Sequence, residues 1–208
     1  MKVAAIVPAY NEEQTIGAVV HALQRSPLIS EVIVVSDGSI DRTVQRARRA
    51  GASVIELDTN VGKGGAMKIG ADQTEADILL FIDADLVGLR NEHIRLLVSP
   101  VLSNNSEMTV GVFEDGRFAT DLAQKIAPFL SGQRAVRRDL FQLIPELEDS
   151  RYGVEVALSR FADKNNSRVT VVHLHDLSQL MKEEKQGFFK GFCARMKMYW
   201  EILRTVKL

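Results

Sequence analysis

The chain has 208 residues, of which 46% are hydrophobic, so it is long enough for one well-packed domain. Its 26 basic and 27 acidic residues nearly balance, which gives no support to a nucleic-acid-binding protein. The single cysteine, Cys193, excludes an internal disulfide and a CxxC zinc site. No apolar run approaches the roughly 20 residues of a membrane-spanning helix, and the first residues are not typical of a signal peptide. We therefore expect a cytoplasmic protein.

The first hundred residues alternate between strand patterns and helix patterns. Short apolar runs predict four strands, at 2–8, 31–38, 53–57 and 78–83. The helices predicted between them cover 12–25, 42–50 and a segment from a glycine-rich loop to about residue 74. This alternation is typical of parallel strands joined by right-handed crossovers, so we expect an α/β fold.

The second half has weaker patterns. We expect helices near 91–102, 118–130 and 151–165, and strands at 107–113 and 168–174. Residues 131–141 predict a strand or turn that leads into a short helix, and the tail from residue 182 to 208 has helical character.

Two acids follow the fourth apolar run, where Asp83 and Asp85 come directly after ILLFI. In open α/β sheets, ligands bind beyond the carboxyl ends of the strands. Two carboxylates one residue apart suit a hard divalent cation that also binds phosphate. Taken alone, the Asp-x-Asp triplet fits a solvated loop equally well.

The end of the first strand carries the motif VPAYNEE, which places Pro8, Ala9 and Tyr10 at the same edge of the sheet. Tyr10 can stack on a base. Glu12 can accept a hydrogen bond from a ribose or base, or it can be an ordinary acid in the first turn of a helix.

Two further motifs follow the second and third strands. In SDGSIDRT, Asp37 can accept from a base or ribose, although the same segment also fits a turn followed by a helix cap at Asp41. In NVGKGGA, the glycines let backbone N–H groups approach a phosphate, and Lys63 adds a positive charge. The loop is neither a Walker A loop nor GxGxxG. The four motifs together predict a nucleoside-diphosphate site.

These motifs, in this order, resemble those of the nucleotide-sugar glycosyltransferases of family 2. The resemblance covers residues 3–86 and implies the GT-A fold, a Rossmann-like and mostly parallel sheet flanked by helices. It implies metal-dependent transfer of a hexose from a UDP- or GDP-sugar. In this resemblance Asp85 binds the Mg²⁺ or Mn²⁺ that bridges the diphosphate, and Asp83 contacts ribose or sugar. The implied donor contacts are Pro8, Ala9, Tyr10, Glu12, Asp37, Lys63, Asp83 and Ala84. Ile40 replaces the family's usual threonine, and we expect this to affect packing only.

The second half resembles the branch of glucosyl-3-phosphoglycerate synthase and mannosylglycerate synthase, in LSGQRAVRR and YGVE. This resemblance places Ser131 and Gly132 beside the donor sugar. Glu155 is then a catalytic or acceptor-binding residue, with an ordinary helix-surface acid as the alternative. Three arginines can bind an anionic acceptor through paired hydrogen bonds, or form a solvated basic turn: Arg134, Arg137 and Arg138. The acceptor is expected to be a phosphorylated small molecule or a lipid phosphate.

Members of the family often complete the metal site with a C-terminal histidine. His173 and His175 lie at the end of the last predicted strand and point the same way, so either can serve. We favour His175, which lies farther toward the edge. His21 and His93 fall in helix patterns and are expected on the surface.

We expect a catalytic domain over 1–178, with a nucleotide-binding half at 1–86 and an acceptor half at 87–178. A basic amphipathic helical tail follows at 179–208, where aromatic and basic side chains interleave. Such a helix can pack on the domain or on a second subunit, which we favour, or lie on an anionic membrane. The protein is therefore expected in the cytoplasm, with peripheral contact at the inner face of the membrane as an option.

Two other functions remain compatible with part of the pattern. A non-catalytic nucleotide-sugar-binding protein would need the same strand-end motifs. A nucleotidyltransferase would share the metal-binding aspartate, but VPAYNEE stands where its glycine-rich loop is expected. Neither Glu114-Asp115 nor Glu148-Asp149 is followed by the QxxRW motif of inverting family members, and the resemblance in SGQRA and YGVE favours retention of configuration.

Overall fold

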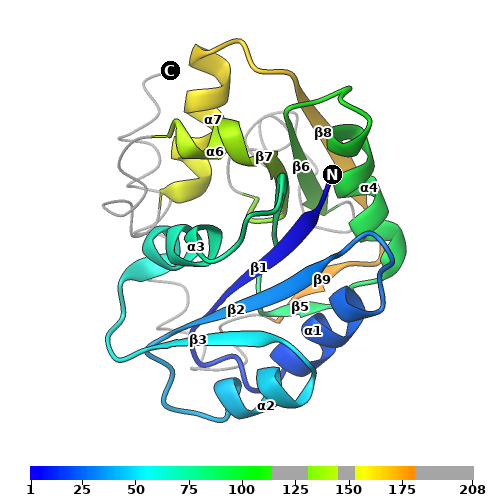
Figure 1. Ribbon diagram of the computed structural model, residues 1–208. Coiled ribbons are helices and arrows are strands. Elements are labelled where there is room, and N and C mark those ends of the chain that lie inside the picture. Colours follow the sequence, from blue (N-terminus) through cyan, green and yellow to red (C-terminus); the bar gives the residue numbers. More distant parts are fainter. Residues whose placement is uncertain (114–130, 145–152, 181–208) are drawn as a thin grey trace, which may run out of the picture. The chain divides into compact units, whose positions relative to one another are not determined.

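The computed structural model describes residues 1–113, 131–144 and 153–180 (Figure 1). Residues Met1–Ser178 form one compact unit, and Gln179–Leu208 form a second. The helix predicted at 118–130 and the helical tail predicted from residue 182 lie outside the described residues. Within the described residues, no helix has the length and hydropathy needed to cross a membrane.

A seven-stranded sheet forms the centre of the first unit, in the order β3-β2-β1-β4-β7-β6-β8. All of its neighbouring strands are parallel except β7, which is antiparallel to both β4 and β6. The strands are β1 (Val3–Ala9), β2 (Glu31–Asp37), β3 (Ser53–Leu57), β4 (Ile78–Phe81), β6 (Met108–Phe113), β7 (Arg134–Arg137) and β8 (Val169–Leu174). The predicted class, a mostly parallel sheet flanked by helices, is confirmed.

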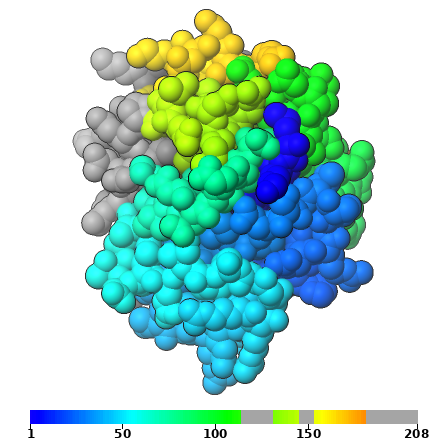
Figure 2. Space-filling model, viewed as in Figure 1, coloured from blue at the N-terminus to red at the C-terminus, as the bar shows by residue number. Residues whose placement is uncertain are grey.

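Helices cover both faces of this sheet (Figure 1). One face packs against α1 (Ile16–Gln24), α2 (Thr43–Arg49) and α4 (Asn91–Leu102). The other packs against α3 (Gly62–Asp72), α6 (Arg138–Gln142) and α7 (Val154–Lys164). In Figure 2, atoms of α3, α6 and α7 are visible on the surface that faces the viewer. Two short strands, β5 (Leu86–Val87) and β9 (Ser178–Gln179), complete the described elements.

Alternating side chains of the central strands divide the core into two main clusters. In β1, Val3, Ala5 and Val7 pack with buried residues of α1 and α4, whereas Ile6 packs with α3. In β4, the same alternation sends Leu80 to the first cluster and Phe81 to the second. Strands that are buried on both faces are continuous apolar runs, as the sequence shows here.

Helix α1 begins later than the sequence indicates. Asn11 precedes the helix predicted at 12–25 but does not cap it, because Asn11 has a positive φ of 56° and its side chain accepts the backbone N–H of Ile40 at 2.9 Å. The helix begins at Ile16. Asp41 behaves as expected, because its carboxylate accepts the backbone N–H of Thr43 at the start of α2.

Helix α3 approaches the sheet closely at Gly70, and this contact should tolerate no side chain. A methyl group at Gly70 would lie 2.5 Å from a methyl carbon of Ile6 and 3.1 Å from one of Val35. We expect Gly70→Ala to lower the free energy of unfolding by about 1–3 kcal/mol through overpacking, measured by urea denaturation. Gly17→Ala in α1 is the control, because no described atom lies within 4 Å of its methyl position. That change should stabilise the helix by about 0.5–1 kcal/mol, and equal effects of the two changes would contradict the packing described.

Candidate active site

The carboxyl ends of the parallel strands bring the predicted motifs to one edge of the sheet. Ala9 of β1 pairs with Ser36 of β2, and Ile6 of β1 pairs with Phe81 of β4. The three strands therefore end side by side, and the residues that follow them lie within reach of one another. Asp83 comes two residues after Phe81, at the centre of this edge.

Lys63 joins both halves of the chain at this edge. Its Nζ lies 2.5 Å from Oδ1 of Asp83 and 2.6 Å from Oε1 of Glu155. The first turn of α3 provides the lysine, the segment after β4 provides Asp83, and the first turn of α7 provides Glu155. Both carboxylates are mostly buried, with 14% and 13% of their side-chain surface exposed. Residues that are 92 positions apart thus share one ion cluster.

The two carboxylates determine the charge of Lys63. Burial alone would lower the pKa of its ammonium group, but the negative charges and hydrogen bonds of Asp83 and Glu155 outweigh burial and raise it above the ordinary value. Lys63 is therefore a protonated, partly enclosed cation throughout the neutral range.

The turn before β7 holds Asp83 in place. The side-chain amide of Gln133 donates to Oδ2 of Asp83 at 3.0 Å and accepts the backbone N–H of Asp83 at 3.1 Å. A methyl group at Gly132 would lie 2.5 Å from both carboxylate oxygens of Asp83 and from Nζ of Lys63, so only glycine fits there. Gly132 was predicted to lie near the sugar, whereas no role was predicted for Gln133. The position of Gln133 directly after the Ser-Gly pair is the only signal for it in the sequence.

Asp37 is buried and binds the start of α3. Its two carboxylate oxygens accept the backbone N–H groups of Val61 at 2.7 Å and Gly62 at 3.0 Å. It therefore fixes the start of α3, which carries Lys63, and these two N–H groups are not available to a phosphate in this conformation. The predicted contact of Asp37 with a base or ribose stays a prediction.

The structure corrects the prediction that Arg134 binds an acceptor. Its side chain is fully buried, with 0% exposure, so a ligand at the surface cannot contact it. The guanidinium donates to the backbone carbonyl of Ser131 at 2.9 Å and to the hydroxyl of Ser159 at 3.0 Å. Burial lowers the pKa of Arg134 to about 10, although the charges of Glu155 and Asp83 act in the opposite direction.

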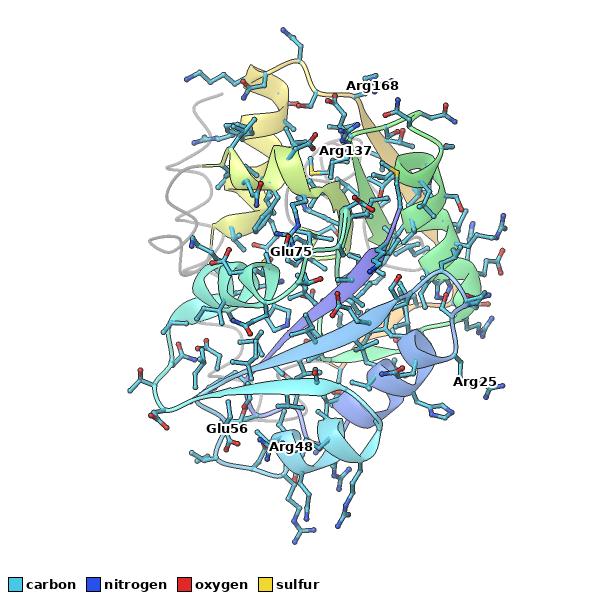
Figure 3. All side chains as sticks on the ribbon, viewed as in Figure 1. Arg25, Arg48, Glu56, Glu75, Arg137 and Arg168 are labelled. Carbon is cyan, nitrogen blue, oxygen red and sulfur yellow. The ribbon has the colours of Figure 1, made fainter. Side chains whose placement is uncertain are left out.

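Arg137 and Arg138 do not belong to this site either. Because β7 is antiparallel to β4, Arg134 pairs with Phe81 but Arg137 pairs with Ile78 at the other end of β4. Three residues of strand separate the two ends by about 10 Å. Arg137 forms an ion pair with Asp139, and Figure 3 labels it near Arg168. Sequence analysis could not give the direction of β7, which decides this point.

Arg138 has a structural role at the same far edge. Its guanidinium donates to the carbonyl of Ala76 at 2.8 Å and to that of Ala71, in the last turn of α3, at 3.1 Å. A cation is favourable beside the carboxyl end of a helix. The predicted acceptor contact of Arg138 is therefore wrong.

Asp85 follows β4 with its Oδ1 atom buried. Among the residues that the structure describes, no group of three histidine, cysteine, aspartate or glutamate side chains lies close enough to hold a metal ion. Such a cage is not needed for Mg²⁺ or Mn²⁺ bound with a nucleotide, because one or two carboxylates, phosphate oxygens and water supply the ligands. A hard carboxylate at the strand end fits this coordination.

The segment after β8 folds back toward Asp85. A side chain at Gly88 would meet the carbonyl of Asp176 at 2.6 Å, so His175 and Asp176 pass close to the segment that follows Asp85. The imidazole of His93 bonds the carbonyl of His175 at 2.8 Å, which tightens this contact. His93 was expected on the surface but is only 3% exposed. Both His173 and His175 are exposed. The metal-ligand role of His175 stays a prediction.

Tyr10 and Ile40 form an exposed rim of the edge. Tyr10 is 52% exposed and Ile40 is 92% exposed, which corrects the expectation that Ile40 affects packing only. The backbone N–H of Asn11 donates to the hydroxyl of Ser39 at 3.1 Å, which joins the two loops. Glu12 lies in the same loop, and its backbone N–H donates to Thr43 at 2.8 Å. Tyr10 is thus free of the core and available for stacking.

The other predicted donor contacts lie on the strand ends themselves. Pro8 and Ala9 are the last two residues of β1, and Ala84 is buried between the two aspartates. The hydroxyl of Ser131 donates to the carbonyl of Gly111, which anchors the turn that contains Gly132. Pro8, Ala9, Ala84 and Ser131 all lie at the carboxyl edge of the sheet. Their predicted contacts with a ligand stay predictions.

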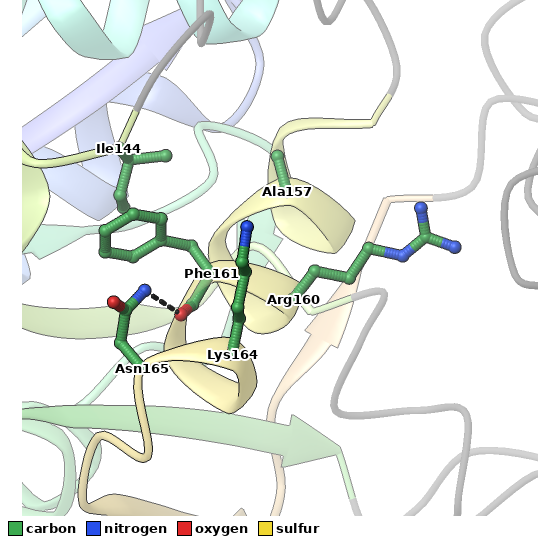
Figure 4. Close-up of a pocket in the computed structure, with 6 residues that line it drawn as sticks. All are labelled: Ile144, Ala157, Arg160, Phe161, Lys164 and Asn165. Carbon is green, nitrogen blue, oxygen red and sulfur yellow. Dashed lines mark hydrogen bonds between the residues drawn. The ribbon is translucent and has the colours of Figure 1, made fainter.

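A cavity of about 330 Å³ lies on α7 but is separate from this edge (Figure 4). Its lining residues are Ile144, Ala157, Arg160, Phe161, Lys164 and Asn165. With 3.6 residues per turn, this face of α7 is opposite to the side that carries Glu155 and Ser159. The cavity is therefore not part of the ion cluster.

Comparison with known proteins gives concordant results. The model of the family described as Glycosyl transferase family 2 matches residues 4–166. Glucosyl-3-phosphoglycerate synthase of Mycobacterium tuberculosis is 31% identical over 195 residues, which covers 75% of this chain and 59% of that protein. The 4,4'-diaponeurosporenoate glycosyltransferase of Staphylococcus haemolyticus is 41% identical over 97 residues, covering 44% of this chain and 26% of that protein. The match thus spans about three fifths of the length of the synthase and about a quarter of the length of the diaponeurosporenoate glycosyltransferase.

Solved structures agree with the sequence match. The M. tuberculosis synthase in complex with Mn²⁺, uridine diphosphate and glucosyl-3-phosphoglycerate has a TM-score of 0.75 at 27% identity, covering 86% of this chain and 72% of that one. The same synthase has also been solved with Mg²⁺ and uridine diphosphate, with a TM-score of 0.72. The resemblance predicted from the motifs is confirmed, and the chain belongs to glycosyl transferase family 2.

Proposed function

We propose that this chain transfers a hexose from a UDP-sugar to an anionic acceptor in a metal-dependent reaction. The observation that carries the proposal is the ion cluster in which Lys63 lies between Asp83 and Glu155, next to Asp85. Mostly buried charged groups that meet at the carboxyl ends of the strands are typical of catalytic sites rather than of surface ion pairs. In the transfer, the bond from the sugar's anomeric carbon to the diphosphate oxygen breaks, a bond to an acceptor oxygen forms, and the proton of that oxygen passes to the departing diphosphate or to water.

Relatives support the choice of donor and metal. Solved complexes of the similar synthase contain UDP-glucose with Mn²⁺, or uridine diphosphate with Mg²⁺. We therefore favour UDP-linked over GDP-linked hexose. In this proposal Tyr10 stacks on the base, Pro8 and Ala9 border it, and Glu12 and Asp37 lie near the nucleoside.

Asp85 is the proposed metal ligand, and His175 is the proposed second one. A bound divalent cation would neutralise negative charge that develops on the departing diphosphate. The approach of Asp176 to Gly88 supports His175, since it brings the end of β8 to the segment after Asp85.

The chain's own charges prepare the reacting centre. Lys63 is proposed to donate to the diphosphate, because a fixed cation stabilises a leaving anion without solvent reorganisation. Asp83 and Glu155 would then bind sugar hydroxyls through the oxygens that contact Lys63 in this structure. Ala84, Ser131 and Gly132 border this space.

The acceptor remains a class rather than a compound. We propose a phosphorylated small molecule or a lipid phosphate, because a complex of the similar synthase holds phosphoglyceric acid. Glu155 is the described residue proposed to face the acceptor, since Arg134, Arg137 and Arg138 are directed elsewhere. The catalytic domain is proposed to extend over 1–178, and the tail to support dimerisation or peripheral membrane contact.

The proposed reaction predicts both binding and turnover of the donor. UDP-glucose should raise the melting temperature more with Mn²⁺ than with a chelator, and more than a GDP-linked hexose at equal concentration. Release of UDP in the presence of phosphoglycerate should depend on the metal. Donor binding without turnover by any phosphorylated acceptor would instead indicate a non-catalytic nucleotide-sugar-binding protein.

Asp85→Ala should remove the metal dependence of donor binding. By calorimetry, we expect Mn²⁺ to tighten UDP binding by about tenfold or more in the unaltered chain, equivalent to ~1.4 kcal/mol, and to have no effect in the variant. Asp77→Ala is the matched control, because Asp77 lies at the opposite end of β4 and accepts the backbone N–H of Lys2. An unchanged Mn²⁺ effect in Asp85→Ala would refute the metal assignment.

Glu155→Gln should slow transfer with little effect on nucleotide affinity. The variant loses one negative charge beside Lys63, so we expect kcat to fall by about a hundredfold. The affinity for UDP should stay within about twofold, since the proposed nucleoside contacts lie on β1 and β2. Asp163→Asn, an exposed acid on the same helix, should leave both quantities unchanged. A wild-type kcat in Glu155→Gln would remove Glu155 from the site.

A further inference from the structure

A buried arginine lies beneath the candidate active site without lining it. Arg134 is the first residue of β7, directly after Gly132 and Gln133, and its side chain is fully buried. A buried guanidinium is costly unless its N–H groups are satisfied, so its partners indicate what it stabilises.

One side of the guanidinium holds the turn that fixes Asp83. Nε donates to the carbonyl of Ser131 at 2.9 Å. The same turn provides Gln133, which binds Asp83 through both its amide oxygen and its amide nitrogen. It also provides Gly132, whose Cα faces Asp83 and Lys63 with no room for a methyl group. Arg134 therefore acts on Asp83 through this turn.

The other side of the guanidinium holds the helix that carries Glu155. Nη1 donates to the hydroxyl of Ser159 at 3.0 Å. Ser159 lies four residues after Glu155 on α7, so both side chains lie on the same face of the helix. Glu155 in turn lies 2.6 Å from Lys63. Arg134 is thus a bridge between the two segments that hold Lys63 from opposite sides.

The charge of Arg134 complements the same two carboxylates. The charges of Glu155 and Asp83 both favour its protonated form, and with a pKa of about 10 it remains a cation at neutral pH despite its burial. Asp83 and Glu155 therefore have two cations near them, Lys63 and Arg134. If Lys63 turns toward a donor diphosphate, Arg134 remains as the cation beneath the two carboxylates.

We propose that Arg134 is a positioning residue that holds Glu155 and Asp83 at a fixed separation for transfer by bridging Ser131 to Ser159. The inference rests on the proposed function, because it assigns Arg134 an effect on catalysis through Glu155. It replaces the acceptor-binding role that the sequence suggested for this arginine.

The chemistry requires arginine rather than lysine. A planar guanidinium directs its donors along divergent, fixed directions, so one side chain can bind the turn and the helix together. A lysine keeps the charge but offers one compact ammonium group, so Arg134→Lys separates the bridge from the charge. Ser159→Ala removes one arm of the bridge and leaves Arg134 itself intact.

A double-mutant cycle tests the proposal. We expect Arg134→Lys to lower kcat by about tenfold in the unaltered chain, but by less than about twofold in a Glu155→Gln background. The calorimetric Kd for UDP should stay within about twofold in every variant, because none of the changed residues is a proposed UDP contact. Ser159→Ala should show the same dependence on Glu155 with a smaller effect, and it serves as the test if Arg134→Lys fails to fold.

Arg137→Lys is the matched control, since it changes an arginine of the same strand whose partners lie at the far edge. It should leave kcat unchanged. Equal losses from Arg134→Lys with and without Glu155 would show a general structural effect and overturn the positioning role, as would wild-type kcat in both Arg134→Lys and Ser159→Ala. Absence of turnover in the unaltered chain would instead overturn the proposed function, and this inference with it.

Discussion

The ammonium group of Lys63, held between Asp83 and Glu155, is the interaction on which the site depends. It joins the start of α3, the segment after β4 and the start of α7, at distances of 2.5 Å to Asp83 and 2.6 Å to Glu155. Breaking a buried pair by removing one partner is costly, because it leaves an uncompensated charge. The elements around the cluster are accordingly fixed by their own hydrogen bonds: Asp37 holds the start of α3, and Gln133 holds Asp83. The sheet edge provides the site, and the contacts of Lys63 with the two carboxylates give it a defined geometry.

The nucleotide-binding half could be predicted from the sequence in most of its detail. Its strands are continuous apolar runs, and parallel strands must end at a common edge, so the motifs at Tyr10, Asp37 and Asp83 had to converge. Local structure was less predictable. Asn11 suits a helix cap by residue type, but here its side chain binds the neighbouring loop. Asp37 was expected to face a ligand, but its carboxylate already binds two backbone N–H groups.

The acceptor half could not be predicted to the same extent, because the residues of β7 do not indicate whether it runs parallel or antiparallel to its neighbours. Four residues of an antiparallel strand place Arg134 beneath the site and Arg137 at the opposite edge. Three arginines that lie close together in the sequence therefore bind different partners in separate parts of the structure. The burial of Arg134, the two-point contact of Gln133 and the burial of His93 all follow from tertiary packing, which periodicity does not report. Glu155 was located correctly at the start of a helix, yet its contact with Lys63 spans 92 residues and needs the fold.

A crystal structure of the chain with Mn²⁺ and UDP-glucose tests the central claim most directly. We predict that Lys63 moves from its contacts with Asp83 and Glu155 to contact the diphosphate. The cation should lie on Asp85, and the glucose between Asp83 and Glu155. Arg134 should still bridge Ser131 and Ser159 in that complex. A donor bound away from Lys63, or a cation held without Asp85, would contradict it.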